Sequence, residues 1–210
     1  MRIASKQKLI GARAVAASAS LILLLGTLCS AVARASGPTP SSPYSISVFA
    51  QSENGYTKPD SITFSSENVF IGYGNGGAPD GSGGAKSTIV EYQMDGAVVK
   101  TFTVVGHNDG LRYDLMTGEL WASQNEDGNS NLAVIDPKTG KQKIYQLGTG
   151  PHGGGYDDLV FEGKSLFLTA SAPTINPNTA PSIVGVKPEG NKADLSPVLS
   201  NCQMLWIGLA

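Results

Sequence analysis

A repeat of about fifty residues constrains the fold of this chain more than any other feature. In each of three segments an aspartate opens a short alternating strand, a turn follows, and a second strand carries an aromatic residue. The aspartates are Asp60, Asp109 and Asp157, and the aromatic residues are Phe70, Trp121 and Phe167. Self-similarity at this spacing indicates a fold built from repeated supersecondary units.

The rest of each unit predicts two further strands. The segments STIVEYQMDG, NLAVIDPKTG and PSIVGVKPEG are apolar, β-branched and end at a Gly turn, and AVVKTFTV and KQKIYQL add a fourth strand to the first two units. Four short strands per unit are typical of a β-propeller blade; the alternative is a β-sandwich with chance similarity. We predict an all-β fold over residues 57–199, a partial β-propeller of about three four-stranded antiparallel blades.

The two ends of the chain have a different character. Basic residues, the apolar run LILLLGTLCSAVA and small residues at Ala33 and Ala35 predict a signal peptide over residues 1–35, too short to span about 30 Å of hydrocarbon comfortably. We therefore expect export to the periplasm or the extracellular space, with no stable membrane span after the signal is removed. Residues 36–56 form an N-terminal lead-in.

The repeat stops before residues 200–210. A fourth unit should open near Leu205 and Trp206, but NCQMLWIGLA has no Asp-led motif. We expect this atypical tail not to form the opening strand of a blade, and we interpret the chain as a truncated or frame-shifted fragment of a longer protein.

Charge and cysteine content exclude some classes of protein. The net charge is -2 and the charged residues are evenly scattered, so no basic stripe is available for nucleic acid. Cys202 is the only cysteine left after signal removal, which rules out an intramolecular disulfide. Stability must therefore come from packing.

Strand reversal predicts where the polar residues gather. In an up-and-down blade, the approach loop that leads into the first strand lies on the same face as the loop joining the second and third strands. We call this face the polar rim, and expect it to bind a small molecule or a protein, because loops on a rigid scaffold carry function. Its candidate residues are Asp60, Asn75, His107, Asp109, Asn125, Glu126, Asp127, His152, Asp157 and Asp158.

The stretch QNEDGNSNL at residues 124–132 has two interpretations. An EF-hand would need an acidic ligand at position 123 and Glu at position 134, where the chain has Ser123 and Val134. One interpretation is a hairpin loop in which Asp127-Gly128 supplies the positive φ. The other is that its side-chain oxygens contribute to a site built from several blades.

The blade-opening aspartates and the histidines also have alternatives. The aspartates could accept backbone N–H bonds that pin neighbouring blades, or could crowd around a channel where a cation such as Ca²⁺ or Mg²⁺ offsets their repulsion. His107 and His152 follow or precede Gly or Asn on loops, so we expect both outside the core. Each is either a proton-transfer group or a surface residue without a role.

The segment NDGLRYDLMTGELWASQN resembles a blade of the SMP-30/gluconolactonase family, and KPDSI and PHGGG are similar to blades of NHL type and of streptogramin lyase. The resemblance covers about residues 57–190 and implies a six-bladed parent. By that resemblance, Asp109 is a ligand of a catalytic divalent cation, and Asn75 or Asn125 supplies a neutral ligand. The family's first ligand, a Glu, has no counterpart here, and Asp60 stands in its place.

Three functions follow from these patterns. The first is an exported propeller that binds a ligand or partner on its polar rim. The second is a divalent-cation-dependent lactone hydrolase with His107 or His152 as the base. The third is a streptogramin-type lyase in which His152 transfers the proton.

Overall fold

The computed structural model describes residues 37–51, 55–174 and 181–200. Its contacts divide the chain into two units, Met1–Ile46 and Ser47–Ala210. Residues 37–46 of the first unit form no helix or strand. The signal peptide of residues 1–35 and the tail of residues 201–210 lie outside the described residues, so both expectations stay predictions.

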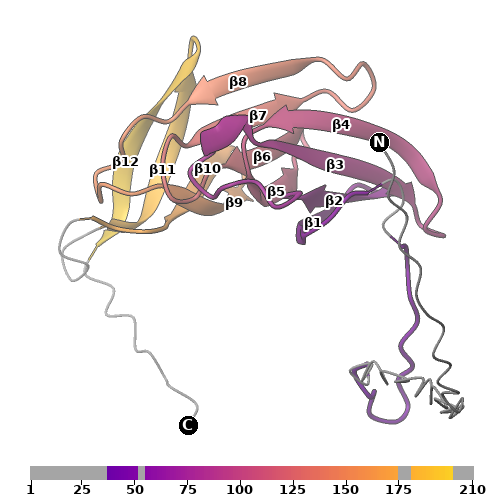
Figure 1. The fold of residues 1–210 in the computed structure, drawn as a ribbon. Coiled ribbons are helices and arrows are strands. Elements are labelled where there is room, and N and C mark those ends of the chain that lie inside the picture. Colours follow the sequence, from indigo (N-terminus) through magenta and orange to yellow (C-terminus); the bar gives the residue numbers. More distant parts are fainter. Residues whose placement is uncertain (1–36, 52–54, 175–180, 201–210) are drawn as a thin grey trace, which may run out of the picture. The chain divides into compact units, whose positions relative to one another are not determined.

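The second unit contains three successive four-stranded antiparallel meanders, which we call blades 1, 2 and 3 (Figure 1). Blade 1 comprises β1 (Pro59–Phe64), β2 (Asn68–Tyr73), β3 (Lys86–Gln93) and β4 (Val98–Val105). Blade 2 comprises β5 (Asn108–Tyr113), β6 (Leu120–Gln124), β7 (Asn131–Ile135) and β8 (Gln142–Gln146). Blade 3 comprises β9 (Tyr156–Glu162), β10 (Ser165–Ala170), β11 (Pro181–Glu189) and β12 (Lys192–Ser200).

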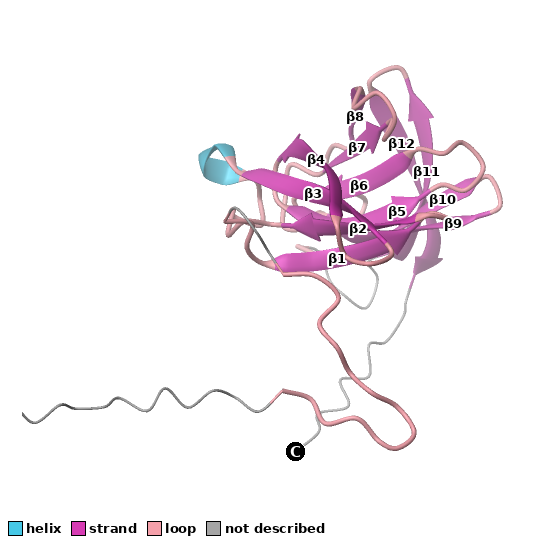
Figure 2. Cartoon of the chain, turned by 90° about the vertical axis from the view of Figure 1, so that its right-hand side faces the viewer, coloured by secondary structure: helices cyan, strands magenta, loops and turns pink. Residues whose placement is uncertain are grey.

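The all-β prediction is confirmed over the described part of the chain. The only helical element there is a 3-10 turn at Ser82–Gly84 (Figure 2). The three predicted aspartates each occupy the second position of a first strand, in β1, β5 and β9. The sequence prediction missed β12, the fourth strand of blade 3, because Pro197 interrupts the segment; β12 pairs along its length only with β11, where a missing N–H is tolerated.

The blades are arranged in the manner of a propeller. The first strands β1, β5 and β9 each have one hydrogen-bonded neighbour, so their other edges are unpaired. β1 packs against β5, and β5 against β9. The outer strands β8 and β12 meet at a single parallel bridge between Lys192 and Gln146, which joins blades 2 and 3.

Each interface between blades is filled by apolar side chains. Phe70 of β2 stacks on Tyr113 of β5, with ring centroids 5.6 Å apart. Trp121 of β6 meets Phe161 of β9 edge to face at 5.5 Å. The aromatic residues of the first two repeats therefore pack under the first strand of the next blade, as the core of that interface.

The side of blade 1 that faces away from blade 2 is partly covered by the segment before β1. Val69, Tyr73, Val90 and Tyr92 form a buried cluster there. Phe49 meets the ring of Tyr92 at 6.0 Å, and Tyr56 meets that of Tyr73 at 5.9 Å. These contacts cover β2 and β3.

Within the described residues, no helix has the length and apolar character needed to cross a membrane.

Candidate functional site at the polar rim

Each blade-opening aspartate lies at an irregularity in strand pairing. The register of β1 shifts between Pro59 and Ser61, and that of β5 shifts between Asn108 and Gly110. In blade 3 the shift lies opposite residues 157 and 158. Bulges bend a strand and redirect its side chains, and they often occur next to functional sites. The repeat thus places Asp60, Asp109 and Asp157 in equivalent bulges at one end of the first strands.

His107 and Asp109 form the closest polar pair of the rim. Nδ1 of His107 lies 2.6 Å from Oδ1 of Asp109, and Oδ2 accepts a hydrogen bond from the backbone N–H of Glu126 at 3.0 Å. The Asp109 side chain is 2% exposed and that of His107 is 16% exposed. The carboxylate is therefore buried behind the imidazole and holds it in place.

Asn75 and Asn125 clamp the approach loops. Asn125 has a φ of 66°, donates its backbone N–H to the His107 carbonyl at 2.8 Å, and accepts the His107 N–H on Oδ1 at 2.8 Å. Asn75 has a φ of 53° and makes the same pair of bonds with Thr57, at 2.9 and 3.1 Å. Asparagine tolerates the left-handed conformation that this clamp requires. Both amide oxygens already accept a backbone hydrogen bond, which gives each a structural role.

The QNEDGNSNL loop differs from the predicted hairpin. The residues with positive φ are Asn125 and Asn129, at 66° and 53°, and Gly128 is not among them. The Gly128 N–H closes the turn on the Asn125 carbonyl at 3.3 Å. Asp127 is exposed and its N–H donates to the Pro79 carbonyl at 3.2 Å. The prediction that Asp127-Gly128 supplies the positive φ is wrong, because the clamp to His107 determines the turn.

Carboxylates from all three blades act on one another. Burial raises the pKa of Asp109 to about 7, against the lowering effect of His107. The pKa of Glu126 is raised by burial and, to a smaller extent, by the nearby Asp157, Asp127 and Asp60. His107 lowers the pKa of Glu126. Burial also raises the pKa values of Asp60 and Asp157; Asp157 raises that of Asp60 further, and His107 lowers it. These interactions show that the rim gathers negative charge around His107.

Strand reversal correctly predicts the neighbouring loops. Asn125 and Glu126 of the β6–β7 loop contact His107 and Asp109 of their own blade. The same loop lies against the approach loop of blade 3, where a Cβ at Gly155 would clash with the Glu126 carbonyl. Among the residues that the structure describes, no group of three or more His, Cys, Asp or Glu side chains is arranged to hold a metal ion. Cation binding by Asp109 therefore stays a prediction.

His152 does not lie outside the core as we expected. It is fully buried, its Nε2 lies 2.6 Å from the Gly155 carbonyl, and its ring meets Tyr156 edge to face at 5.0 Å. Burial raises the pKa of Tyr156 to about 12. The glycines of the approach loop allow this, since a Cβ at Gly150 would clash with the Tyr156 hydroxyl and the His152 ring.

Asp158 lies between two blades. Its Oδ2 accepts a hydrogen bond from Nη2 of Arg112 at 2.7 Å, which links β9 to β5. Its Oδ1 accepts the N–H of Leu159 at 2.8 Å. Both partners of the ion pair are more than a third exposed, so the pair contributes little to stability. The carboxylate of Asp158 is therefore already engaged in a contact between blades.

Sequence reasoning did not identify Asn108, which connects blades 1 and 2. It is fully buried and its amide nitrogen donates to the carbonyls of Gly110 and Ser123, at 3.0 and 3.1 Å. Its amide oxygen accepts from the Ser61 hydroxyl at 2.9 Å, and its backbone N–H donates to Ser87. The one sequence feature that could have pointed to Asn108 is its position directly before Asp109. That position alone does not reveal its partners in another blade.

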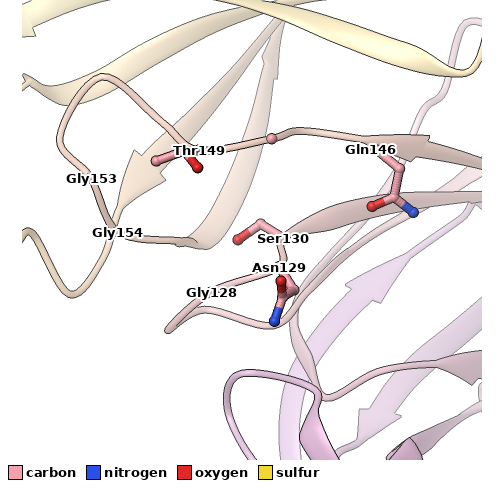
Figure 3. Close-up of a pocket in the computed structure, with 8 residues that line it drawn as sticks. Gly128, Asn129, Ser130, Gln146, Thr149, Gly153 and Gly154 are labelled. Carbon is pink, nitrogen blue, oxygen red and sulfur yellow. The ribbon is translucent and has the colours of Figure 1, made fainter.

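A small hollow lies beside the polar rim, between the loops of blades 2 and 3 (Figure 3). It has a volume of about 240 Å³ and is open to solvent. Its lining consists of Gly128, Asn129, Ser130, Gln146, Gly148, Thr149, Gly153 and Gly154. Of the predicted rim residues none lines it, so the hollow and the carboxylates around His107 are separate features.

The fold and the rim define an all-β protein of propeller-like blades with an acidic, histidine-containing rim. No protein-family model matches the chain. No curated protein matches it significantly in sequence. The resemblance to lactonase blades therefore remains an expectation from the sequence.

Replacing Asp109 by asparagine is expected to flatten the pH dependence of stability between about pH 4 and 7. The pKa of Asp109 is raised from 3.8 to about 7 in the folded protein, so the folded state binds this proton more tightly than the unfolded chain. The free energy of unfolding therefore falls as pH rises through this window, and this contribution is absent from the variant. Asp60, Glu126 and Asp157 act in the same direction in both proteins.

Urea denaturation at intervals from pH 4 to 8 measures this difference. Glu67→Gln, at an exposed carboxylate, is the matched control and should keep the wild-type slope. Equal slopes for wild type and Asp109→Asn would show that the pKa of Asp109 is not raised in the folded protein.

Proposed function

We propose that this is an exported protein whose polar rim binds a positively charged ligand, either a small molecule or a segment of a protein. The observation that carries the proposal is the placement of Asp60, Asp109 and Asp157 in equivalent bulges at one end of the first strands, with Asp109 bonded to His107 and to the Glu126 N–H. The raised pKa values of Asp60, Asp109 and Glu126 agree with this crowding of carboxylates. A bound cation would lower the pKa values of these carboxylates and relieve their repulsion.

The rim divides into a fixed part and an accessible part. Asp109 is buried and bonded to His107 and to the Glu126 N–H, so it orients the imidazole. Asp60 and Asp157 are exposed, and each belongs to the first strand of a different blade. We assign direct contact with the ligand to these two carboxylates, with Glu126 beside them.

Calorimetric titration with CaCl₂, MgCl₂ and spermidine tests the proposal. We expect binding of at least one of these cations, and the double variant Asp60→Asn/Asp157→Asn should bind it at least about tenfold more weakly, a difference of about 1.4 kcal/mol. Glu67→Gln should bind as the wild type does. Absence of binding by all three probes, or an unchanged affinity in the double variant, would contradict the proposal.

A divalent-cation-dependent lactone hydrolase is the second candidate, favoured by the His107–Asp109 pair. A carboxylate on Nδ1 fixes the tautomer of the imidazole and leaves Nε2 as the base. Nε2 faces the backbone of Gly74, where an added Cβ would lie 2.6 Å away. Turnover of a lactone that requires Ca²⁺ and His107 would distinguish this activity from binding alone.

The lyase hypothesis has no comparable support. It depends on His152, which is fully buried and bonded to Gly155.

A further inference from the structure

A second hollow lies between blades 2 and 3, at the end of their first strands opposite the polar rim. It has a volume of about 290 Å³ and is open to solvent. Its apolar wall contains Trp121 of β6, Phe161 of β9, Leu166 of β10 and Val186 of β11. The turns that follow β5 and β9 line its exposed side. We call it the aromatic hollow, and it belongs to an interface within the chain.

The wall of the aromatic hollow suits a flat apolar group. Trp121 and Phe161 meet edge to face, with ring centroids 5.5 Å apart, so a third ring can pack against both. Ligand pockets are lined mainly by apolar and aromatic side chains with a few polar groups. An apolar cavity of about 150 Å³ is enough to hold benzene. The aromatic hollow therefore has room for one aromatic ring with a short substituent.

The polar end of Trp121 has no role in the fold. Its Nε1 is buried and has no hydrogen-bond partner among the residues that the structure describes. The N–H of a buried tryptophan usually finds a partner, and a buried polar group without one requires an explanation. An acceptor oxygen of a bound molecule supplies such a partner, which points to a ligand that carries oxygen.

The charges beside the aromatic hollow favour an anionic substituent. Lys164 is exposed in the β9–β10 turn and forms no ion pair within the described part of the chain. Asp114 also lines the hollow, but its two oxygens accept hydrogen bonds from the Met116 N–H at 2.9 Å and from the Thr117 hydroxyl at 2.8 Å. The Asp114 carboxylate therefore holds the β5–β6 turn, and Lys164 is left to pair with a ligand.

We propose that the aromatic hollow binds a small aromatic carboxylate. The ring of the ligand lies against Trp121 and Phe161, and its carboxylate supplies the oxygens that Lys164 and the indole N–H lack. Lys164 selects acids over amines of the same shape, because a cation would meet its ammonium group.

Calorimetric titration of the purified full chain with phenylacetate tests the proposal, and benzylamine is the cationic probe with the same ring. We expect phenylacetate to bind with a Kd of about 1 mM or lower, an ordinary affinity for a ligand of its size. Benzylamine should bind at least about threefold more weakly, since it exchanges one exposed ion pair for a repulsion. In ¹H–¹⁵N NMR spectra of Trp206→Phe, whose remaining tryptophan is Trp121, phenylacetate should shift the indole N–H signal.

Two variants locate the binding site. Val186→Phe fills the hollow and should weaken phenylacetate binding at least about tenfold, because overpacked side chains leave no space for the ring. Lys164→Gln should weaken it about two- to fivefold, as for loss of an exposed ion pair, and should remove the preference over benzylamine. Lys187→Gln is the matched control and should bind as the wild type does, since Lys187 is exposed on β11 and does not line the hollow. Circular dichroism verifies folding, and Val186→Met replaces Val186→Phe if the larger ring prevents folding.

Absence of saturable phenylacetate binding at about 10 mM, where a site with millimolar Kd is mostly occupied, would overturn the proposal. Benzylamine binding as tight as that of phenylacetate would do so as well. The same holds for an unshifted indole signal, or for an unchanged phenylacetate affinity in Val186→Phe or Lys164→Gln. The aromatic hollow shares no residue with the polar rim, so its failure leaves the proposed function untouched.

Discussion

Replacing Trp121 by alanine is expected to lower the free energy of unfolding by about 3 to 5 kcal/mol, as for other large buried aromatic residues. Trp121 is 9% exposed and stacks on Tyr145, with ring centroids 6.1 Å apart and planes at 5°. Phe161 of blade 3 meets it edge to face at 5.5 Å. The substitution therefore removes packing within blade 2 and between blades 2 and 3.

The surroundings of Trp121 limit how far the site can collapse. The indole already borders an apolar hollow of about 290 Å³ that Phe161, Leu166 and Val186 also line. Removing the ring enlarges this space, and the cost of a core truncation grows with the cavity that remains. Urea denaturation measures the effect. Trp121→Phe is the matched control and should lose less, since it keeps a ring against Phe161. A loss below about 1 kcal/mol for Trp121→Ala would contradict this account of the interface.

Replacing Asn108 by aspartate is expected to cost about 3 kcal/mol or more. The new side chain has nearly the same shape but has no N–H, so the carbonyls of Gly110 and Ser123 lose their donor and face an oxygen. Each buried polar group without a partner costs about 1 to 3 kcal/mol. No cavity forms, which separates this effect from packing.

The same denaturation experiment checks this prediction against a graded control. Ser61→Ala removes only the hydroxyl bond to the Asn108 amide oxygen, and should cost about 1 kcal/mol. An Asn108→Asp variant no less stable than Ser61→Ala would show that the two donor bonds of Asn108, to Gly110 and Ser123 of its own blade, do not stabilise the protein as predicted.

The alternation of apolar residues and the spacing of the aspartates were sufficient to predict most of the strands. Asp60, Asp109 and Asp157 each lie at the second position of a first strand. Strand period, turn residues and repeat length are local properties, so they can be read along the chain. The gathering of His107, Asp109, Asn125 and Glu126 also followed, because strand direction alone decides which loops share a face.

The sequence did not reveal features that depend on contacts between distant residues. Asn108 links two blades because its amide oxygen accepts a hydrogen bond from Ser61 of another blade. His152 is buried because the glycines of its loop let its ring turn toward Tyr156. The turn at residues 124–132 follows the clamp of Asn125 on His107, so local Asp-Gly preference does not determine it.

The sequence by itself therefore determined the all-β fold and the face on which polar loops meet. The tertiary structure alone decided which polar side chains are occupied by other blades and which apolar residues stay uncovered. Equivalent residues have equivalent sequence signals in every repeat, yet Tyr113 and Phe161 are packed while Phe64 is exposed. The difference is the presence of a preceding blade, and burial depends on the neighbour that covers a residue as well as on the residue itself.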